Sequence, residues 1–191
     1  MSRRACGWAL AVASLLGATP ASAQNGREYF IEPDTALDAA HAIQRDVFVV
    51  LRDSTAAINS AGARLMSDMT PSSSLAWMRS RSTAITEACA RAVAPLAAAR
   101  ELTLDTKWPL ARQETARTNL LKEMSSFGTE LAACQKRWAG LAADTSRTNL
   151  RENAPYQMKL LQEQVDQFNR AVGSYLRLIS VKLPPQGTPK R

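Results

Sequence analysis

Two cysteines are the residues whose placement most directly suggests chemistry. Cys89 and Cys134 both fall on apolar stripes at helical spacing, so each side chain is expected to face inward. Beyond residues 1–23, which are the predicted signal peptide, the chain has an even number of cysteines, and this favours a disulfide in an oxidising compartment. Two free thiols would instead act as small buried hydrophobic groups. The sequence therefore names Cys89–Cys134 as a possible disulfide.

The expected turn between these cysteines complicates that pairing. If the chain turns over residues 103–108, Cys89 lies opposite residue 122, about 12 residues or ~18 Å from Cys134. The same tight turn brings Trp77 close to Trp138, so the two indoles would pack together. Direct pairing of the cysteines needs a turn centred farther along the chain. The disulfide and the contact between the indoles remain competing predictions.

His41 is the only histidine of the chain. Metal sites and acid–base catalysis need further converging groups, so we expect it to be a helix-flank residue without a special role. The sequence contains none of four common site motifs. These are the paired Glu-x-x-His of di-iron bundles, the Cys-x-x-Cys-His of covalent haem attachment, the Gly-x-Ser-x-Gly of serine nucleophiles and glycine-rich phosphate loops. Glu163 and Asp166 lie beside basic residues at helical spacing, which is typical of surface pairs. We therefore expect that the protein is not an enzyme and that it binds neither a metal nor a cofactor. A haem held by His41 and Met158 is a remote alternative.

A small basic cluster is the one candidate binding surface. Arg79 and Arg81 lie close to Trp77, and Lys136 and Arg137 directly precede Trp138. With the tight turn these charges gather at one end of two helices, where they would attract an anionic partner. Interspersed acidic residues favour an ordinary solvated face instead.

The apolar spacing predicts an all-α protein. Helices are expected over about 33–69, 71–102, 109–145 and 155–183, and Pro95 is expected to kink or stop the second. The last three carry apolar residues at alternating intervals of three and four, a coiled-coil-like seam. Short joints make successive helices antiparallel neighbours. We expect an elongated antiparallel up-down-up-down four-helix bundle over residues 24–183, with a flexible tail over 184–191.

The N-terminus is typical of a cleaved signal peptide. Arg3 and Arg4 precede a short apolar stretch, and small residues precede a cleavage site after Ala23. Cys6 comes before the apolar stretch, so it is not a lipidation site. Residues 1–23 contain two of the 24 basic residues and none of the 17 acidic ones, so the net charge falls from +7 to +5 on cleavage. We expect an exported, soluble product, periplasmic or secreted, with no transmembrane segment and no nucleic-acid partner.

These patterns favour a non-catalytic helical interaction protein of the bacterial-type cell envelope, with a chaperone-like, scaffolding or secretion-accessory role. Its partner is expected to be a protein, or a second copy in self-association. Leu121, Leu160 and Leu176 lie beside the seams and would be available to that partner. The alternative is a small-molecule or haem-binding bundle acting as a sensor or carrier, with Ser54 and Ser82 lining a cavity.

Overall fold

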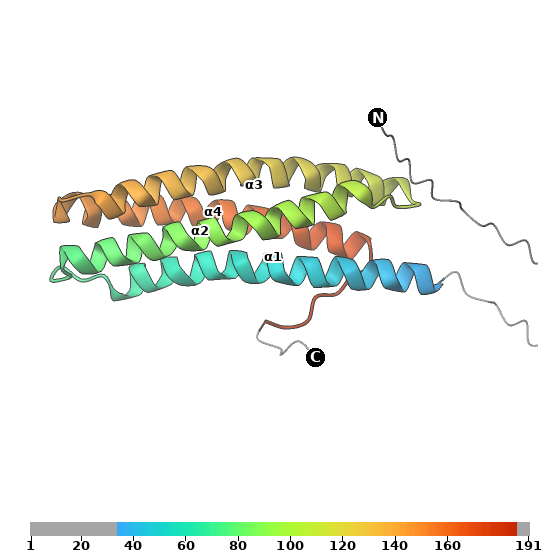
Figure 1. The fold of residues 1–191 in the computed structure, drawn as a ribbon, viewed down its shortest axis with the longest axis horizontal. Coiled ribbons are helices and arrows are strands. Elements are labelled where there is room, and N and C mark those ends of the chain that lie inside the picture. Colours follow the sequence, from blue (N-terminus) through green and yellow to red (C-terminus); the bar gives the residue numbers. More distant parts are fainter. Residues whose placement is uncertain (1–33, 187–191) are drawn as a thin grey trace, which may run out of the picture. The chain divides into compact units, whose positions relative to one another are not determined.

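The computed structural model of the protein describes residues 34–186. In this part of the chain it contains four helices and no strand (Figure 1). Their bounds are α1 Asp34–Asp68, α2 Leu75–Asp105, α3 Ala111–Ala143 and α4 Arg147–Leu178. The prediction of an all-helical fold with four helices is confirmed, and the arrangement is consistent with a four-helix bundle. The predicted signal peptide, residues 1–23, lies outside the described residues, as do residues 187–191 of the predicted tail.

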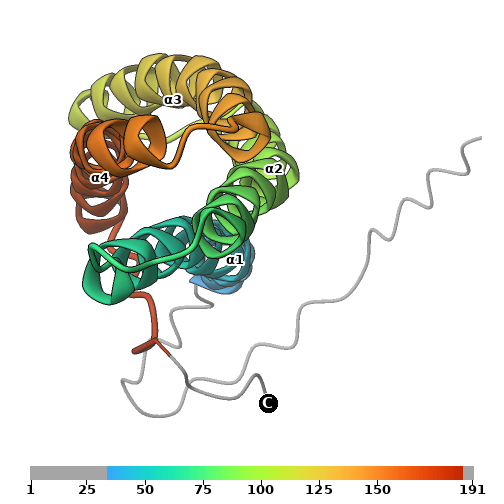
Figure 2. The ribbon, with the colours of Figure 1, turned by 90° about the vertical axis from the view of Figure 1, so that its left-hand side faces the viewer.

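Viewed end-on, the helices follow one another around a common axis, α1 beside α2, α2 beside α3 and α3 beside α4 (Figure 2). Apolar side chains from all four helices fill the space between them. At 31 to 35 residues, each helix is roughly 50 Å long at 1.5 Å per residue. None of the described helices is long and apolar enough to cross a membrane.

The helix starts differ from the predicted ones because serine caps decide them. Ser74 accepts a hydrogen bond from the backbone N–H of Trp77, so α2 begins at Leu75 instead of Pro71. Ser146 accepts one from Asn149, so α4 begins at Arg147, eight residues before the predicted start at Pro155. The added turns of α4 bury Leu150 and Ala154.

Both helix-interior prolines are accommodated. The α2 helix continues through Pro95 to Asp105, so the predicted early stop there is wrong. Pro155 likewise lies inside α4. A proline removes one backbone hydrogen bond from a helix, and packing of the flanking turns against the core offsets that loss. Ala92, Leu96 and Ala99 are the buried neighbours of Pro95.

The apolar stripe at helical spacing in the sequence of α1 supplies only part of its core. Leu51, Ile58 and Leu65 of this stripe are buried, but Ile43 and Val50 are 54% and 39% exposed. Apart from Val49, the buried positions are spaced by four and three residues in alternation: Gln44, Phe48, Leu51, Thr55, Ile58, Gly62 and Leu65. Gln44, Thr55 and Gly62 lack large apolar side chains, so apolar periodicity does not identify them.

Each non-apolar core position of α1 has a specific partner. The Gln44 side chain donates to Thr106 at 2.9 Å, and the Thr55 hydroxyl lies 3.1 Å from the amide oxygen of Asn169. Gly62 leaves room for Met158, because a Cβ at this position would lie 2.1 Å from the Met158 sulfur. Hydrogen bonds to α4 and the α2–α3 loop compensate for part of the lost water, while the buried Gln44 Oε1 has no hydrogen-bond partner among the described residues.

The α2–α3 register resolves the competition between the cysteines and the tryptophans. Cys89 and Cys134 form a disulfide, with Cα atoms 6.5 Å apart. In the same register the Arg79 Nε donates to the Ala142 carbonyl at 2.6 Å. The turn lies over residues 106–110, later than the predicted 103–108. Trp77 is therefore several residues out of step with Trp138, and the predicted packing of the two indoles is wrong.

Candidate functional site

His41 belongs to a structural contact at one end of the helices. Its ring stacks on the Trp108 indole with centroids 5.9 Å apart. Among the described residues, no group of three or more His, Cys, Asp or Glu side chains could hold a metal ion. Met158 packs at Gly62, which is 21 residues beyond His41 on α1, or roughly 30 Å along the helix. The pairing of His41 with Met158 as haem ligands is therefore wrong.

Trp108 anchors the α2–α3 loop to the core. Its indole N–H donates to the Tyr175 hydroxyl at 3.0 Å, and its backbone N–H donates to Glu114 at 2.6 Å. This backbone hydrogen bond, helped by the Arg117 guanidinium, lowers the pKa of the Glu114 carboxyl. Burial raises the pKa of Tyr175, with the Trp108 donor opposing that shift. Tyr175 therefore stays neutral and acts as a fixed acceptor.

Replacing Tyr175 with phenylalanine is expected to lower the free energy of unfolding by about 1–3 kcal/mol, because the buried Trp108 N–H loses its acceptor. Urea denaturation followed by circular dichroism measures the change. Tyr156, which is 61% exposed on the same helix, provides the matched control, and Tyr156→Phe should be nearly neutral. Equal stabilities of Tyr175→Phe and Tyr156→Phe would argue against the anchor.

The predicted anionic-partner surface does not assemble as expected. Arg79 is used in the hydrogen bond to Ala142, and Arg137 pairs with Glu130 at 3.4 Å. Arg81 lies over the Trp77 ring, 5.4 Å from its centroid, while Lys136 is exposed elsewhere on α3. The reason is the register: the pairing of Cys89 with Cys134 shifts α3 lengthwise against α2 relative to the predicted alignment, so Lys136 and Arg137 no longer face Arg79 and Arg81.

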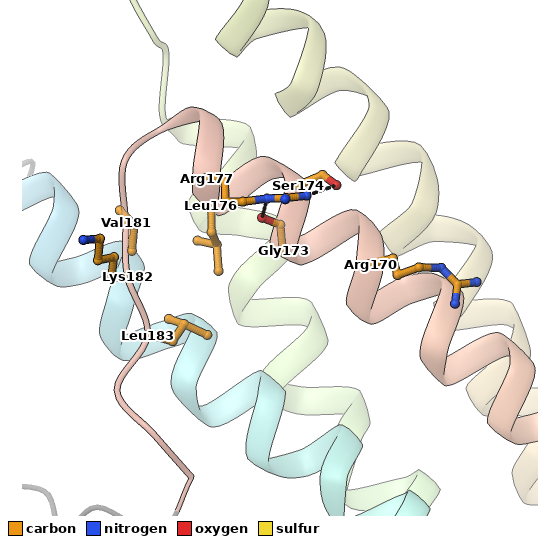
Figure 3. A pocket seen from close by; sticks show the side chains of 8 residues that line it. All are labelled: Arg170, Gly173, Ser174, Leu176, Arg177, Val181, Lys182 and Leu183. Carbon is orange, nitrogen blue, oxygen red and sulfur yellow. Dashed lines mark hydrogen bonds between the residues drawn. The ribbon is translucent and has the colours of Figure 1, made fainter.

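An open pocket of about 640 Å³ lies between α4 and the segment that follows it (Figure 3). On α4 its lining residues recur at one helix face: Arg170, Gly173, Ser174 and Arg177, with Leu176 beside them. The opposite wall is the segment Val181, Lys182 and Leu183. The pocket therefore exists because the chain folds back along α4 once the helix has ended.

Several contacts hold this wall in place. Ser180 adopts a φ of 61°, which reverses the chain, and the Val181 N–H donates to the Leu176 carbonyl at 2.9 Å. The side chains of Val181 and Leu176 are both buried. Arg52 of α1 donates a hydrogen bond to the Pro184 carbonyl. Pro184 of the predicted tail is thus held against α1.

The leucines predicted to serve a partner are partly used by the core. Leu176 is only 4% exposed, because the returning segment covers it, so its predicted availability is wrong. Leu121 packs partly buried against the core, and Leu160 is half-buried. Burial of these side chains therefore contributes to the stability of the fold.

The pocket combines positive charge with an apolar floor. Arg170 and Lys182 are exposed and have no ion pair among the described residues. Arg177 donates to the Gly173 carbonyl and the Ser174 hydroxyl, each at 3.3 Å, which orients its guanidinium along the rim (Figure 3). No carboxylate is among the lining residues. This arrangement suits a ligand group that carries negative charge beside apolar surface.

Sequence reasoning missed this pocket. The spacing of Arg170 and Arg177 with small residues between them is visible in the sequence, but it equally fits a solvated helix face. The second wall comes from residues 181–183, which were expected to continue the helix. Helix α4 ends at Leu178, and that early end creates the site.

Comparisons of this chain with protein-family models, with curated proteins and with solved structures found no match. The functional argument therefore rests on the geometry and chemistry of the chain itself.

Proposed function

We propose that this chain is a non-catalytic helical interaction protein of the bacterial-type cell envelope, with a chaperone-like, scaffolding or secretion-accessory role. The observation that carries the proposal is the contrast between a filled interior and an open, positively charged pocket on the surface. Export through the expected signal peptide is part of the proposal. A disulfide between α2 and α3 suits the oxidising compartments outside the cytoplasm.

The proposed architecture is an antiparallel up-down-up-down bundle. Contacts between residues far apart in sequence support it, because successive contacts run in opposite directions along the two helices of a pair. The α1–α4 pair is an example: Phe48 packs against Tyr175 with ring centroids 5.8 Å apart, and Met158 packs at Gly62. Moving forward along α1 thus means moving backward along α4.

The filled interior favours binding at the surface over binding between the helices. Trp138, Tyr175, Phe48 and Phe168 are among the largest fully buried side chains. Ser82, expected to line a cavity, donates to the Met78 carbonyl of its own helix, and Ser54 donates to Val50. Neither serine offers a free polar group to a bound molecule. These observations therefore do not favour a haem or small molecule bound between the helices.

The pocket defines the chemistry of the proposed partner. Arg170, Arg177 and Lys182 would attract carboxylates, while Leu183, which is only partly buried, would contact apolar side chains. A partner protein segment in which acidic residues flank apolar ones satisfies both requirements. Charge complementarity of this kind sets specificity and the association rate more than it sets affinity.

Site-specific photocrosslinking tests this proposal. Benzoylphenylalanine replacing Ser174 in the pocket should form an adduct with one defined protein in native envelope extract, whereas the same residue replacing exposed Thr129 on α3 should not. Charge reversal by Arg170→Glu should reduce the adduct at least about tenfold, which corresponds to roughly 1.4 kcal/mol. The matched control is Arg151→Glu, an exposed arginine of α4 outside the pocket.

Three results would contradict the proposal: no adduct from position 174, equal adducts from positions 174 and 129, or equal losses in the two charge-reversal variants. An adduct of twice the mass of the chain would identify the partner as a second copy, which would still be an interaction through this pocket.

A further inference from the structure

A second hollow, distinct from the pocket beside α4, lies between α1 and α2. This arginine groove has a volume of about 220 Å³ and is lined by Ala57, Ser60, Ala61 and Arg64 of α1 and by Arg81, Ala84 and Arg91 of α2. Small side chains form its floor, so a ligand can approach the two helices closely. All of its charged lining residues are arginines.

The charges of the arginine groove are largely uncompensated. Arg64 is exposed and has no ion pair among the described residues. Arg91 lies 3.5 Å from Glu87, but both side chains are at least 60% exposed, and such pairs contribute little. Arg64 and Arg81 therefore place two like charges in one groove without a carboxylate among the lining residues. A bound anion would relieve their repulsion.

Two further features organise the groove for an oxyanion. The Arg81 guanidinium is oriented by the Trp77 ring, 5.4 Å from its centroid, which limits its conformational freedom before binding. The Ser60 hydroxyl, one helical turn before Arg64, has no hydrogen-bond partner among the described residues and can donate to a ligand. Two guanidinium forks and a hydroxyl thus surround the same small hollow.

We propose that the arginine groove binds a phosphoryl group. A phosphate ester carries about −1.5 to −2 charges and three strong acceptor oxygens, which matches two arginines and one hydroxyl donor. A single carboxylate has one charge and would leave one guanidinium unpaired. Arg91 lies ten residues farther along α2, roughly 15 Å at helical rise, so it would contact only a more distant negative group of a longer ligand.

Isothermal titration with inorganic pyrophosphate, at constant ionic strength, tests the groove directly. Arg64→Gln and Arg81→Gln should each weaken binding about tenfold or more, because each removes one guanidinium from the ligand. Arg151→Gln removes the same charge from an exposed helix position outside the groove and should change the dissociation constant less than about twofold. Circular dichroism checks that all variants retain their helices, since glutamine and arginine have similar helix propensities.

Two further arms distinguish the source of the phosphoryl group. Binding of pyrophosphate without binding to vesicles of phosphatidylglycerol indicates a soluble phosphate compound. Binding to phosphatidylglycerol vesicles, but not to phosphatidylcholine vesicles, that is lost in Arg64→Gln and Arg81→Gln indicates a lipid headgroup. Both outcomes support the proposal.

The proposal is overturned if neither pyrophosphate nor the anionic vesicles bind, or if Arg151→Gln weakens binding as much as the groove variants. It is also overturned if sulfate at the same concentration competes equally well with pyrophosphate, because the groove would then respond to charge alone. Arg170→Glu, in the pocket beside α4, should leave pyrophosphate binding unchanged. The proposal for the arginine groove can therefore be disproved while the proposal for the partner pocket is supported, and the reverse is also possible.

Discussion

Replacing both Cys89 and Cys134 with alanine is expected to lower the free energy of unfolding by about 4 kcal/mol at 25 °C. The bridge joins positions 45 residues apart, and closing a loop of that size restricts the unfolded chain by roughly this amount in the chain-entropy description. Guanidinium denaturation of the wild type and the double variant, both without reductant, measures the difference. Such a loss is a large share of the stability of an ordinary domain.

The matched control is the same comparison under full reduction. Both proteins then lack the bridge, so their free energies of unfolding should differ only by the packing of two buried sulfur atoms. If the double variant loses less than about 1 kcal/mol without reductant, the disulfide contributes little and the loop-closure argument is wrong.

Replacing Phe168 with alanine is expected to destabilise the protein by about 3–5 kcal/mol. The Phe168 ring is buried and stacks on Phe127 of α3, with centroids 4.2 Å apart and planes 6° from parallel. Its removal leaves a cavity at the α3–α4 contact, where neighbouring side chains can relax only partly. Denaturation by urea, monitored at the same wavelength for all variants, measures the cost.

Leu104 supplies the control for this substitution. It is a large apolar residue that is 42% exposed, so Leu104→Ala should change the free energy of unfolding by less than about 0.5 kcal/mol. The double variant of Phe127 and Phe168 should lose less than the sum of the single losses, because both substitutions remove the same ring contact. Additive losses would show that the rings do not stabilise each other.

Periodicity predicts three of the four helix faces because those faces are mostly apolar, with Ser82 and Thr103 of α2 as buried polar exceptions. The seam of α4 from Met158 to Ile179 is buried at every predicted position, and the seam of α3 is buried from Leu120 to Trp138. In α1 the core face contains Gln44, Thr55 and Gly62. These three residues contact Thr106, Asn169 and Met158 in the core, and the three partners are far away in sequence. Such partners cannot be identified before the helices are placed.

The binding sites were harder to predict than the helices because they depend on how the helices align lengthwise. The lengthwise alignment that pairs Cys89 with Cys134 separates Arg81 from Lys136 and Arg137. Arg81 instead shares a groove with Arg64, a residue that the sequence pattern did not single out. The pocket beside α4 depends likewise on the helix ending at Leu178. A shift of a few residues therefore decides which charges meet.

The alignment of α2 with α3 decides between the competing predictions for the cysteines and the tryptophans, and an unreduced peptide map tests it most directly. After alkylation of the folded protein and digestion with trypsin, peptides 82–91 and 123–136 should appear as one covalently linked species of a monomer. Reduction should then release both. Two alkylated thiols on the folded protein would contradict this alignment, and the rejection of the Trp77–Trp138 contact and of the predicted basic cluster would fall with it.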